Sequence, residues 1–272
     1  MELKDKVALV LGAIKGIGKG IGFALAEEGA KIALNYFDWE ENLDEMRQDF
    51  AKTGQDHLII KTDLLETDKI HGLIEKVVDH FGRLDILVNN IERGGWPVVH
   101  GPYNQEQWDL EMATTLRAKR WAFATALPHL KASGAGTVIN LSSIAGVVGR
   151  TGPASYIFND GYAAANRGIS LLTETWARIG APEVRVNEIM LGFFETRHGA
   201  KTRGWELLSD EQKKALMDHT LLGRTGSIED VAKAVLFVIK EAPFMTGSIL
   251  RLDGGYLLGG DEVDPMPKGI LS

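Results

Sequence analysis

The chain has 272 residues, 44% hydrophobic and 25% charged, which is enough for one large α/β domain, and no long Pro/Ser-rich or charged linker divides it. It contains no cysteine, which excludes disulfides, thiolate catalysis and Cys-ligated zinc, and its net charge of −7 disfavours nucleic acid as a partner. No apolar run approaches the roughly 18 residues of a membrane span, and no signal-peptide apolar stretch precedes the first predicted strand. We therefore predict a cytoplasmic protein with no membrane association.

Short apolar runs alternate with helical patterns along almost the whole chain. The apolar runs predict strands at residues 6–11, 31–37, 57–62, 84–89, 137–141, 184–190 and 248–252. Helices are expected between them, at residues 19–28, 40–52, 69–81, 105–131, 162–179 and 228–240. Because such strands are buried on both faces and crossovers are right-handed, the pattern predicts a single domain, residues 1–272, with a doubly wound parallel sheet.

A glycine-rich turn joins the first predicted strand to the first helix. It contains Gly12, Gly16 and Gly18, with Lys15 and Ile17 between them. The start of a helix presents unpaired N–H groups and a positive dipole end to a phosphate, and glycines allow close approach. We predict dinucleotide binding through these five residues. The alternative is a tight turn with no ligand.

Polar side chains end three of the later strands, at the edge where ligands of parallel sheets bind. Asp63 follows the third strand, ahead of Leu64, and Asn89 and Asn90 end the fourth. Their carboxylate and amide groups could hold an adenine, although an Asp or Asn at a strand end is often only a turn former. Ser143 follows the fifth strand.

Taken in order, these motifs resemble the short-chain dehydrogenase/reductase family over about residues 3–260. Further matches are Arg185-Val186-Asn187, Gly192-Phe193-Phe194-Glu195-Thr196, Leu222-Gly223-Arg224 and Thr246-Gly247. The resemblance implies a Rossmann-type, seven-stranded parallel sheet in the order 3-2-1-4-5-6-7. It also implies a nicotinamide cofactor, hydride transfer to or from a small carbonyl or alcohol substrate, and a homodimer or homotetramer built by the long helices 105–131 and 162–179. The segment at about 192–220 is expected on the substrate side.

The resemblance also suggests how the cofactor is held. Four further contacts are implied: Ile91, Gly192, Phe194 and Thr196. Tyr36 stands where an acid would bond the ribose hydroxyls of NAD, and Lys15 lies beside the phosphate turn. These two residues favour NADP over NAD, although Asp38 is close enough in sequence to reverse the preference.

In that family a Tyr is the general acid or base, a Ser bonds the substrate oxygen, and a Lys four residues after the Tyr lowers its pKa and holds the ribose. Ser143 matches the Ser, but two tyrosines compete. Tyr156 lies thirteen residues after Ser143, yet Asp160 stands at its lysine position. Tyr162 opens a helix that resembles the catalytic one throughout, with Asn166 at the lysine position.

The sequence Asn159-Asp160-Gly161 is typical of a helix cap. It therefore favours a six-residue insertion in the loop before the helix, and with it Tyr162 over Tyr156. An insertion of that length inside the helix would rotate the downstream apolar face by about 240°.

Two other positions depart from the family. Thr115, seven residues after Trp108, stands where the family has an Asn, and Glu92 stands where a Gly is expected. Lys119, one helical turn beyond Thr115, or Arg167 could supply a relocated cation. The alternative is that both are solvated surface charges.

We therefore predict an NAD(P)-dependent oxidoreductase with an altered acid–base site. The alternative is a nucleotide-binding sensor or partner subunit that has lost turnover. A dehalogenase-like hydrolase on the same fold is disfavoured, because the chain keeps the glycine turn. The histidines show no metal-ligand spacing, so no metal is predicted.

Overall fold

The computed structural model describes residues 2–92, 103–194, 205, 208–261, 263–267 and 269. Its strands are β1 (Val7–Leu11), β2 (Lys31–Tyr36), β3 (His57–Lys61), β4 (Ile86–Asn89), β5 (Gly136–Ser143), β6 (Val184–Leu191) and β7 (Ile249–Leu252). They form one seven-stranded sheet in the order β3-β2-β1-β4-β5-β6-β7, and every neighbouring pair is parallel. The predicted fold class and strand order are confirmed.

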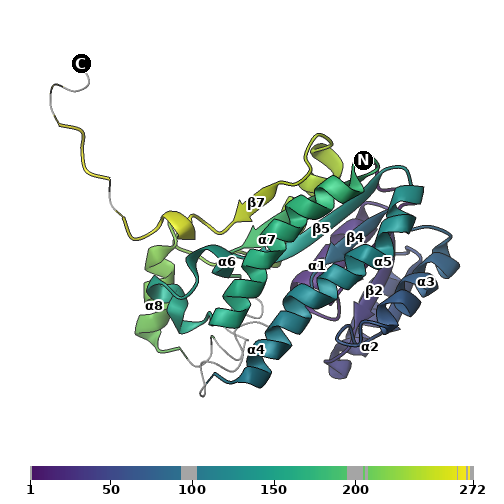
Figure 1. Ribbon diagram of the computed structural model, residues 1–272, viewed down its shortest axis with the longest axis horizontal. Coiled ribbons are helices and arrows are strands. Elements are labelled where there is room, and N and C mark those ends of the chain that lie inside the picture. Colours follow the sequence, from purple (N-terminus) through teal and green to yellow (C-terminus); the bar gives the residue numbers. More distant parts are fainter. Residues whose placement is uncertain are drawn as a thin grey trace.

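Helices cover both faces of this sheet (Figure 1). They are α1 (Gly16–Glu27), α2 (Leu43–Lys52), α3 (Lys69–Phe81), α4 (Gln105–Glu111), α5 (Ala118–Ala132), α6 (Ala145–Val148), α7 (Asp160–Gly180), α8 (Asp210–His219) and α9 (Ile228–Leu236). Buried residues of α1, α2 and α9 share one core with the sheet, and those of α3, α5 and α7 share another. The π-helical segment Met112–Arg117 joins α4 to α5, so these make up the predicted long helix.

The central strand β1 divides its side chains between the two cores. Ala8 and Val10 belong to the α1 side, and Val7, Leu9 and Leu11 to the α5 side. Burial on both faces explains why this strand is a continuous apolar run rather than an alternating one. No helix in the described part of the chain is both long and apolar enough to cross a bilayer.

Two elements differ from the sequence expectation. β5 is longer than predicted, because its pairing with β6 continues to Ser143↔Leu191. The segment 192–220 contains α8, which opens with a capping box between Ser209 and Gln212. The helix α8 is mostly polar and buries Leu216 alone, so it lacks the apolar stripe by which such helices are recognised.

Candidate active site

The turn before α1 fits a phosphate group. Lys15, the residue before the helix, is extended and makes no side-chain cap to the first-turn N–H groups. Gly12 and Gly16 have φ angles of +68° and +60°, which favour glycine. A Cβ on Gly18 would lie 2.3 Å from Gly12 O and 2.5 Å from Asn90 Nδ2. The first-turn N–H groups that Lys15 leaves uncapped suit a dinucleotide pyrophosphate, and the absence of a side chain at Gly18 lets the helix start pack against Gly12 and Asn90.

The two asparagines at the end of β4 bind different partners. Asn90 Nδ2 donates to Gly12 O at 2.9 Å and so ties the strand end to the glycine turn. Asn89 Nδ2 donates to Asn140 Oδ1, and Asn140 Nδ2 to Thr173 Oγ1, each at 2.8 Å. Asn89 Oδ1 is buried with no hydrogen-bond partner in the described part of the chain. Asn89 therefore links β4 to β5 and α7, and Asn90 shapes the predicted cofactor turn.

Residues predicted to bind the adenosine half lie at the carboxyl ends of β2 and β3. Tyr36 and Leu64 are buried. Asp63 Oδ1 accepts from Leu65 N at 3.0 Å, which is the turn-forming contact that such a residue commonly makes. The Lys15 ammonium lies over the Trp39 ring, in the loop after β2. A cation and the neutral Tyr36 thus border the predicted ribose site.

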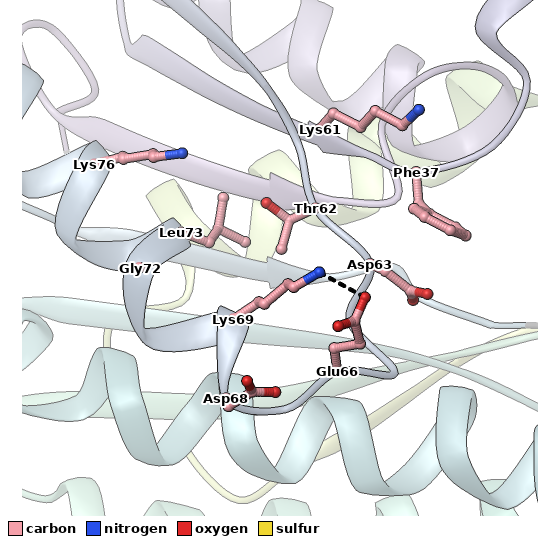
Figure 2. A pocket seen from close by; sticks show the side chains of 10 residues that line it. All are labelled: Phe37, Lys61, Thr62, Asp63, Glu66, Asp68, Lys69, Gly72, Leu73 and Lys76. Atoms are coloured by element: carbon pink, nitrogen blue, oxygen red, sulfur yellow. Dashed lines mark hydrogen bonds and ion pairs between the residues drawn. The ribbon is translucent and has the colours of Figure 1, made fainter.

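Two cavities open on this adenosine side. Figure 2 shows the first, of about 410 Å³, where Asp63, Phe37 and the first turns of α3 meet. Three lysines and three acidic side chains line it, so it has no preference for an anion. The second, of about 300 Å³, is lined by Lys15 and Gly16 of the glycine turn. Neither cavity is lined by Ser143 or Tyr162.

Tyr162 lies in the first turn of α7, as the cap sequence predicts. Asn159 Oδ1 accepts from Tyr162 N at 2.8 Å and caps the helix. The side chain is buried, and its hydroxyl donates to Glu92 Oε1 at 2.7 Å. Tyr156 lies instead in the 3₁₀ turn Gly152–Tyr156, with 38% of its surface exposed. Tyr162 therefore lies on the long helix after the capped turn, and Tyr156 lies in the loop before it. The choice of Tyr162 as the catalytic tyrosine stays a prediction.

Asn166 bonds to the backbone. Its Oδ1 accepts from Ser143 N at 2.9 Å, and its Nδ2 donates to Tyr162 O at 3.0 Å. It is fully buried and carries no charge. Ser143 Oγ accepts from Ala145 N at 3.1 Å. Asn166 thus joins the candidate serine to the candidate tyrosine but supplies no cation at the lysine position.

Thr115 and Lys119 point inward from the helical segment facing the strand ends. Thr115 is buried in the π-helical segment, and its Oγ1 has no hydrogen-bond partner in the described part of the chain. Lys119 is fully buried, and its Nζ donates to Leu141 O at 2.5 Å. Burial lowers the pKa of Lys119 to about 8, against the opposing attraction of Glu92 and Glu188. The expectation of a solvated surface charge is wrong for Lys119, whereas Arg167 is exposed.

Sequence reasoning missed Glu188, a buried carboxylate on β6. Its Oε1 accepts from the hydroxyls of Ser142 and Ser170, and its Oε2 has no hydrogen-bond partner in the described residues. Burial raises the pKa of Glu188, and Lys119 opposes that shift. A charged residue inside the otherwise buried strand Val184–Leu191 was the signal that could have found it.

The remaining predicted cofactor residues have packing roles in the described structure. Ile91 packs against the α5-side core. A Cβ on Gly192 would lie 2.7 Å from Asp253 Cα, and Phe194 is buried against Gly226. Thr196 lies outside the described residues. These three residues are thus packed in the described structure, and their contact with a cofactor stays a prediction.

The chain is similar to known oxidoreductases over nearly its whole length. The family model described as enoyl-(acyl carrier protein) reductase matches residues 12–257. The 3-oxoacyl-[acyl-carrier-protein] reductase of Staphylococcus aureus is 32% identical, covering 93% of this chain and 98% of that protein. Cis-4-hydroxycyclohexanecarboxylate dehydrogenase of Sinomonas cyclohexanicum is 30% identical, covering 93% and 96%.

The chain also superimposes on solved structures of oxidoreductases. NADPH-dependent 3-quinuclidinone reductase of Rhodotorula rubra superimposes with a TM-score of 0.82 at 28% identity, covering 94% of this chain and 93% of that one. A structure described as a short-chain alcohol dehydrogenase of Sinorhizobium meliloti superimposes with a TM-score of 0.83 at 29% identity, covering 95% of this chain and 98% of that one. The chain belongs to the short-chain dehydrogenase/reductase family, whose members are NAD(P)-dependent oxidoreductases.

Proposed function

We propose that the protein interconverts a small carbonyl compound and its alcohol with a nicotinamide cofactor, and that Tyr162 exchanges a proton with the substrate oxygen. The observation that carries this proposal is the buried Tyr162 hydroxyl, which donates to Glu92 at 2.7 Å. Ser143, the residue proposed to bond the same oxygen, is linked to Tyr162 through Asn166.

The cofactor would lie along the carboxyl edge of the sheet. The glycine turn would hold the pyrophosphate, and Asp63 and Leu64 the adenine. When bound, the nicotinamide supplies or accepts the hydride. NADP is the preferred form in this proposal, because Lys15 can pair with a ribose phosphate and Tyr36 offers no carboxylate to repel it. The Rhodotorula relative is an NADPH-dependent reductase, which supports that preference.

The proton path uses two residues of this chain. In the oxidation direction, the proton of the substrate hydroxyl passes to Tyr162 Oη as the Tyr162 proton passes to Glu92 Oε1. Reduction runs the same path backwards, with the protonated Glu92 restoring the phenol. A tyrosine in water titrates near 10, so at neutral pH it needs a partner that takes its proton at the moment of transfer.

The substrate is proposed only as a class. Relatives are named for a 3-oxoacyl group, a hydroxycyclohexanecarboxylate and 3-quinuclidinone, each of which contains a ketone or a secondary alcohol. These names support a carbonyl or alcohol substrate without fixing its size. We place the substrate side at the segment 192–220 of a single cytoplasmic domain.

We also propose a homodimer or homotetramer. Trp121 on α5 is 42% exposed, and Leu171 and Ile179 on α7 are 67% and 49% exposed. Large apolar side chains gathered on two neighbouring helices favour burial against a second copy. Analytical ultracentrifugation at micromolar concentration tests this, and a monomer would contradict it.

A nucleotide-binding sensor without turnover is the second candidate. The observation that favours it is the uncharged Asn166, whose amide is bonded to the backbone where the family resemblance places a lysine. Assays of a broad panel of ketones and alcohols with both nicotinamide cofactors separate the two candidates. Turnover by the unaltered protein supports the enzyme. Binding by calorimetry without turnover, together with ketone reduction gained in Asn166→Lys, supports the sensor.

A further inference from the structure

The most unusual side chain in the described structure is Lys119, a fully buried lysine in the first turn of α5. Lysine is rarely buried unless it is paired, because removing an ammonium from water is costly. Its Nζ donates to Leu141 O at 2.5 Å, just past the end of the β4–β5 pairing at Asn89↔Asn140. A hydrocarbon side chain could fill the same space without that cost, so packing alone does not explain a lysine here.

Lys119 has charged neighbours from two elements. Glu188 approaches from β6 and Glu92 from the loop after β4, and both attract the ammonium. Glu188 is held in place by the hydroxyls of Ser142 and Ser170. Its Oε2, however, has no hydrogen-bond partner in the described residues, so its charge is not fully balanced by hydrogen bonds.

Glu92 connects this buried cluster to the proposed reaction. Glu92 accepts a hydrogen bond from the Tyr162 hydroxyl. Only the ionised form of its carboxylate can then take up the Tyr162 proton. An ammonium favours the ionised form of a carboxylate that it attracts. Lys119 is therefore placed to act on Tyr162 through Glu92, without contacting the substrate.

We propose that Lys119 is a positioning residue of the Tyr162–Glu92 pair: its ammonium, held by Leu141 O and balanced by Glu188, keeps Glu92 in the carboxylate form that accepts the Tyr162 proton. This inference rests on the proposed function, in which Tyr162 is the acid–base group. It assigns a role to a lysine from α5, and the position on α7 occupied by Asn166 needs no cation.

Of the other ionisable groups on the packed elements, Glu111 of α4 is buried and accepts from Tyr103 and Asn159. Arg167 of α7 is exposed and acts on Glu188 from the solvent side. Glu75 of α3 pairs at 3.4 Å with His129, at the far end of α5. Asp85, before β4, pairs with Arg83 at 2.5 Å. Among the described charged groups, Glu92 and Glu188 are thus the partners that set the state of Lys119.

The test is a titration of Glu92 in the full-length, cofactor-free protein. Glutamate labelled with ¹³C at the carboxyl group is incorporated, and the Glu92 signal is assigned by its loss in Glu92→Gln. Lys119→Met removes the buried ammonium. Lys131→Met, on the same helix but partly exposed and 3.8 Å from Glu183, is the matched control. Glu188→Gln removes the second carboxylate.

We expect the Glu92 titration midpoint to rise by about one pH unit in Lys119→Met, as for loss of one nearby charge. It stays unchanged in Lys131→Met and does not rise in Glu188→Gln. An unchanged midpoint in Lys119→Met would overturn the inference. If Lys119→Met does not fold, the double variant Lys119→Met/Glu188→Gln, which removes both buried charges, is measured in its place and the same rise is expected.

A second readout separates this inference from the proposed function. In the unaltered protein, turnover in the oxidation direction should fall on the acid side, as Glu92 takes up a proton and can no longer accept that of Tyr162. The midpoint of this acid limb should rise by about one pH unit in Lys119→Met and stay in place in Lys131→Met. An acid limb that does not move in Lys119→Met means that Lys119 is only structural. Absence of turnover in the unaltered protein rejects the proposed function, whereas the Glu92 titration still decides the inference.

Discussion

The hydroxyl of Tyr162 donates to the carboxylate of Glu92 across 2.7 Å, so the candidate acid–base residue faces an anion. The family resemblance suggests a cation four residues further along the helix, but Asn166 stands there and bonds Ser143 N. A carboxylate partner cannot stabilise a phenolate by charge, but it can accept the phenolic proton as the substrate delivers its own. In the proposed mechanism the pair works as a relay in which Tyr162 contacts the substrate and Glu92 holds the proton.

The first prediction concerns Glu92→Gln. Glutamine can still accept the Tyr162 hydrogen bond, but it cannot take up the proton. Turnover should fall by about 10²-fold or more, the usual contribution of general acid–base catalysis. Steady-state kinetics check the rate, and calorimetry should show unchanged cofactor affinity. Glu183→Gln, an exposed carboxylate before β6 that pairs with Lys131, is the control. Full turnover in Glu92→Gln would remove Glu92 from the mechanism.

The second prediction concerns the glycine turn. In Gly18→Ala the new Cβ would lie 2.3 Å from Gly12 O, and backbone cannot move aside as a flexible side chain can. We expect loss of cofactor binding, with a stability loss of about 1–3 kcal/mol. Gly134→Ala, in the turn after α5 with no atom within 4 Å of the new Cβ, is the matched control. Its φ of +78° disfavours a side chain, so it should lose about 1–2 kcal/mol of stability and keep its affinity. Equal cofactor binding by both variants would contradict a phosphate site at the turn.

The third prediction is a pH dependence of stability caused by Lys119. Its pKa is about 8 in the folded protein and near 10.4 when unfolded. Between these values the unfolded chain binds more protons, so the free energy of unfolding increases with pH, by about 3 kcal/mol in total. The destabilisation is fully present below pH 8 and is relieved above about 10.4. Urea denaturation at a series of pH values gives the free energy of unfolding of the unaltered protein and of Lys119→Met. The free energy of the unaltered protein should rise with this slope relative to that of Lys119→Met. Parallel plots of the two free energies against pH would show that the lysine does not titrate in that window.

The fourth prediction concerns the choice of cofactor. Lys15→Ala should weaken NADP binding by about tenfold, since a charge-assisted bond to phosphate contributes roughly 1.5–3 kcal/mol. NAD binding should be unchanged. Lys52→Ala, an exposed lysine on α2 that pairs with Asp49, should affect neither cofactor. Calorimetry with both cofactors makes the comparison. An equal loss for NAD and NADP would mean that Lys15 does not contact the ribose phosphate.

The fold could be predicted because its signals are local. Each strand is a short apolar run, each crossover is right-handed, and the strand order followed from the family resemblance. The choice of Tyr162 also rested on a local signal, since Asn159 caps the helix through a backbone group three residues away. Helix α8 was missed because its stability comes from caps and charges rather than an apolar stripe.

The buried charges could not be predicted, because their partners are distant in sequence. Lys119 bonds a carbonyl 22 residues away, and Glu188 bonds Ser142, 46 residues away. A lysine on a helix is exposed in most proteins, so the sequence alone favours a surface position for it. The carboxylate within β6 was the one local sign of this cluster, since a buried strand seldom carries a charge without a partner.

The central claim is that Tyr162, and not Tyr156, exchanges the proton. Tyr162→Phe and Tyr156→Phe each remove one hydroxyl and leave the ring in place, and calorimetry should show that both variants bind the cofactor normally. Turnover of the best ketone or alcohol substrate is then measured for each variant beside the unaltered protein. We predict that turnover falls by about 10²-fold or more in Tyr162→Phe and stays close to the unaltered rate in Tyr156→Phe. Full turnover in Tyr162→Phe, with loss in Tyr156→Phe, would contradict it.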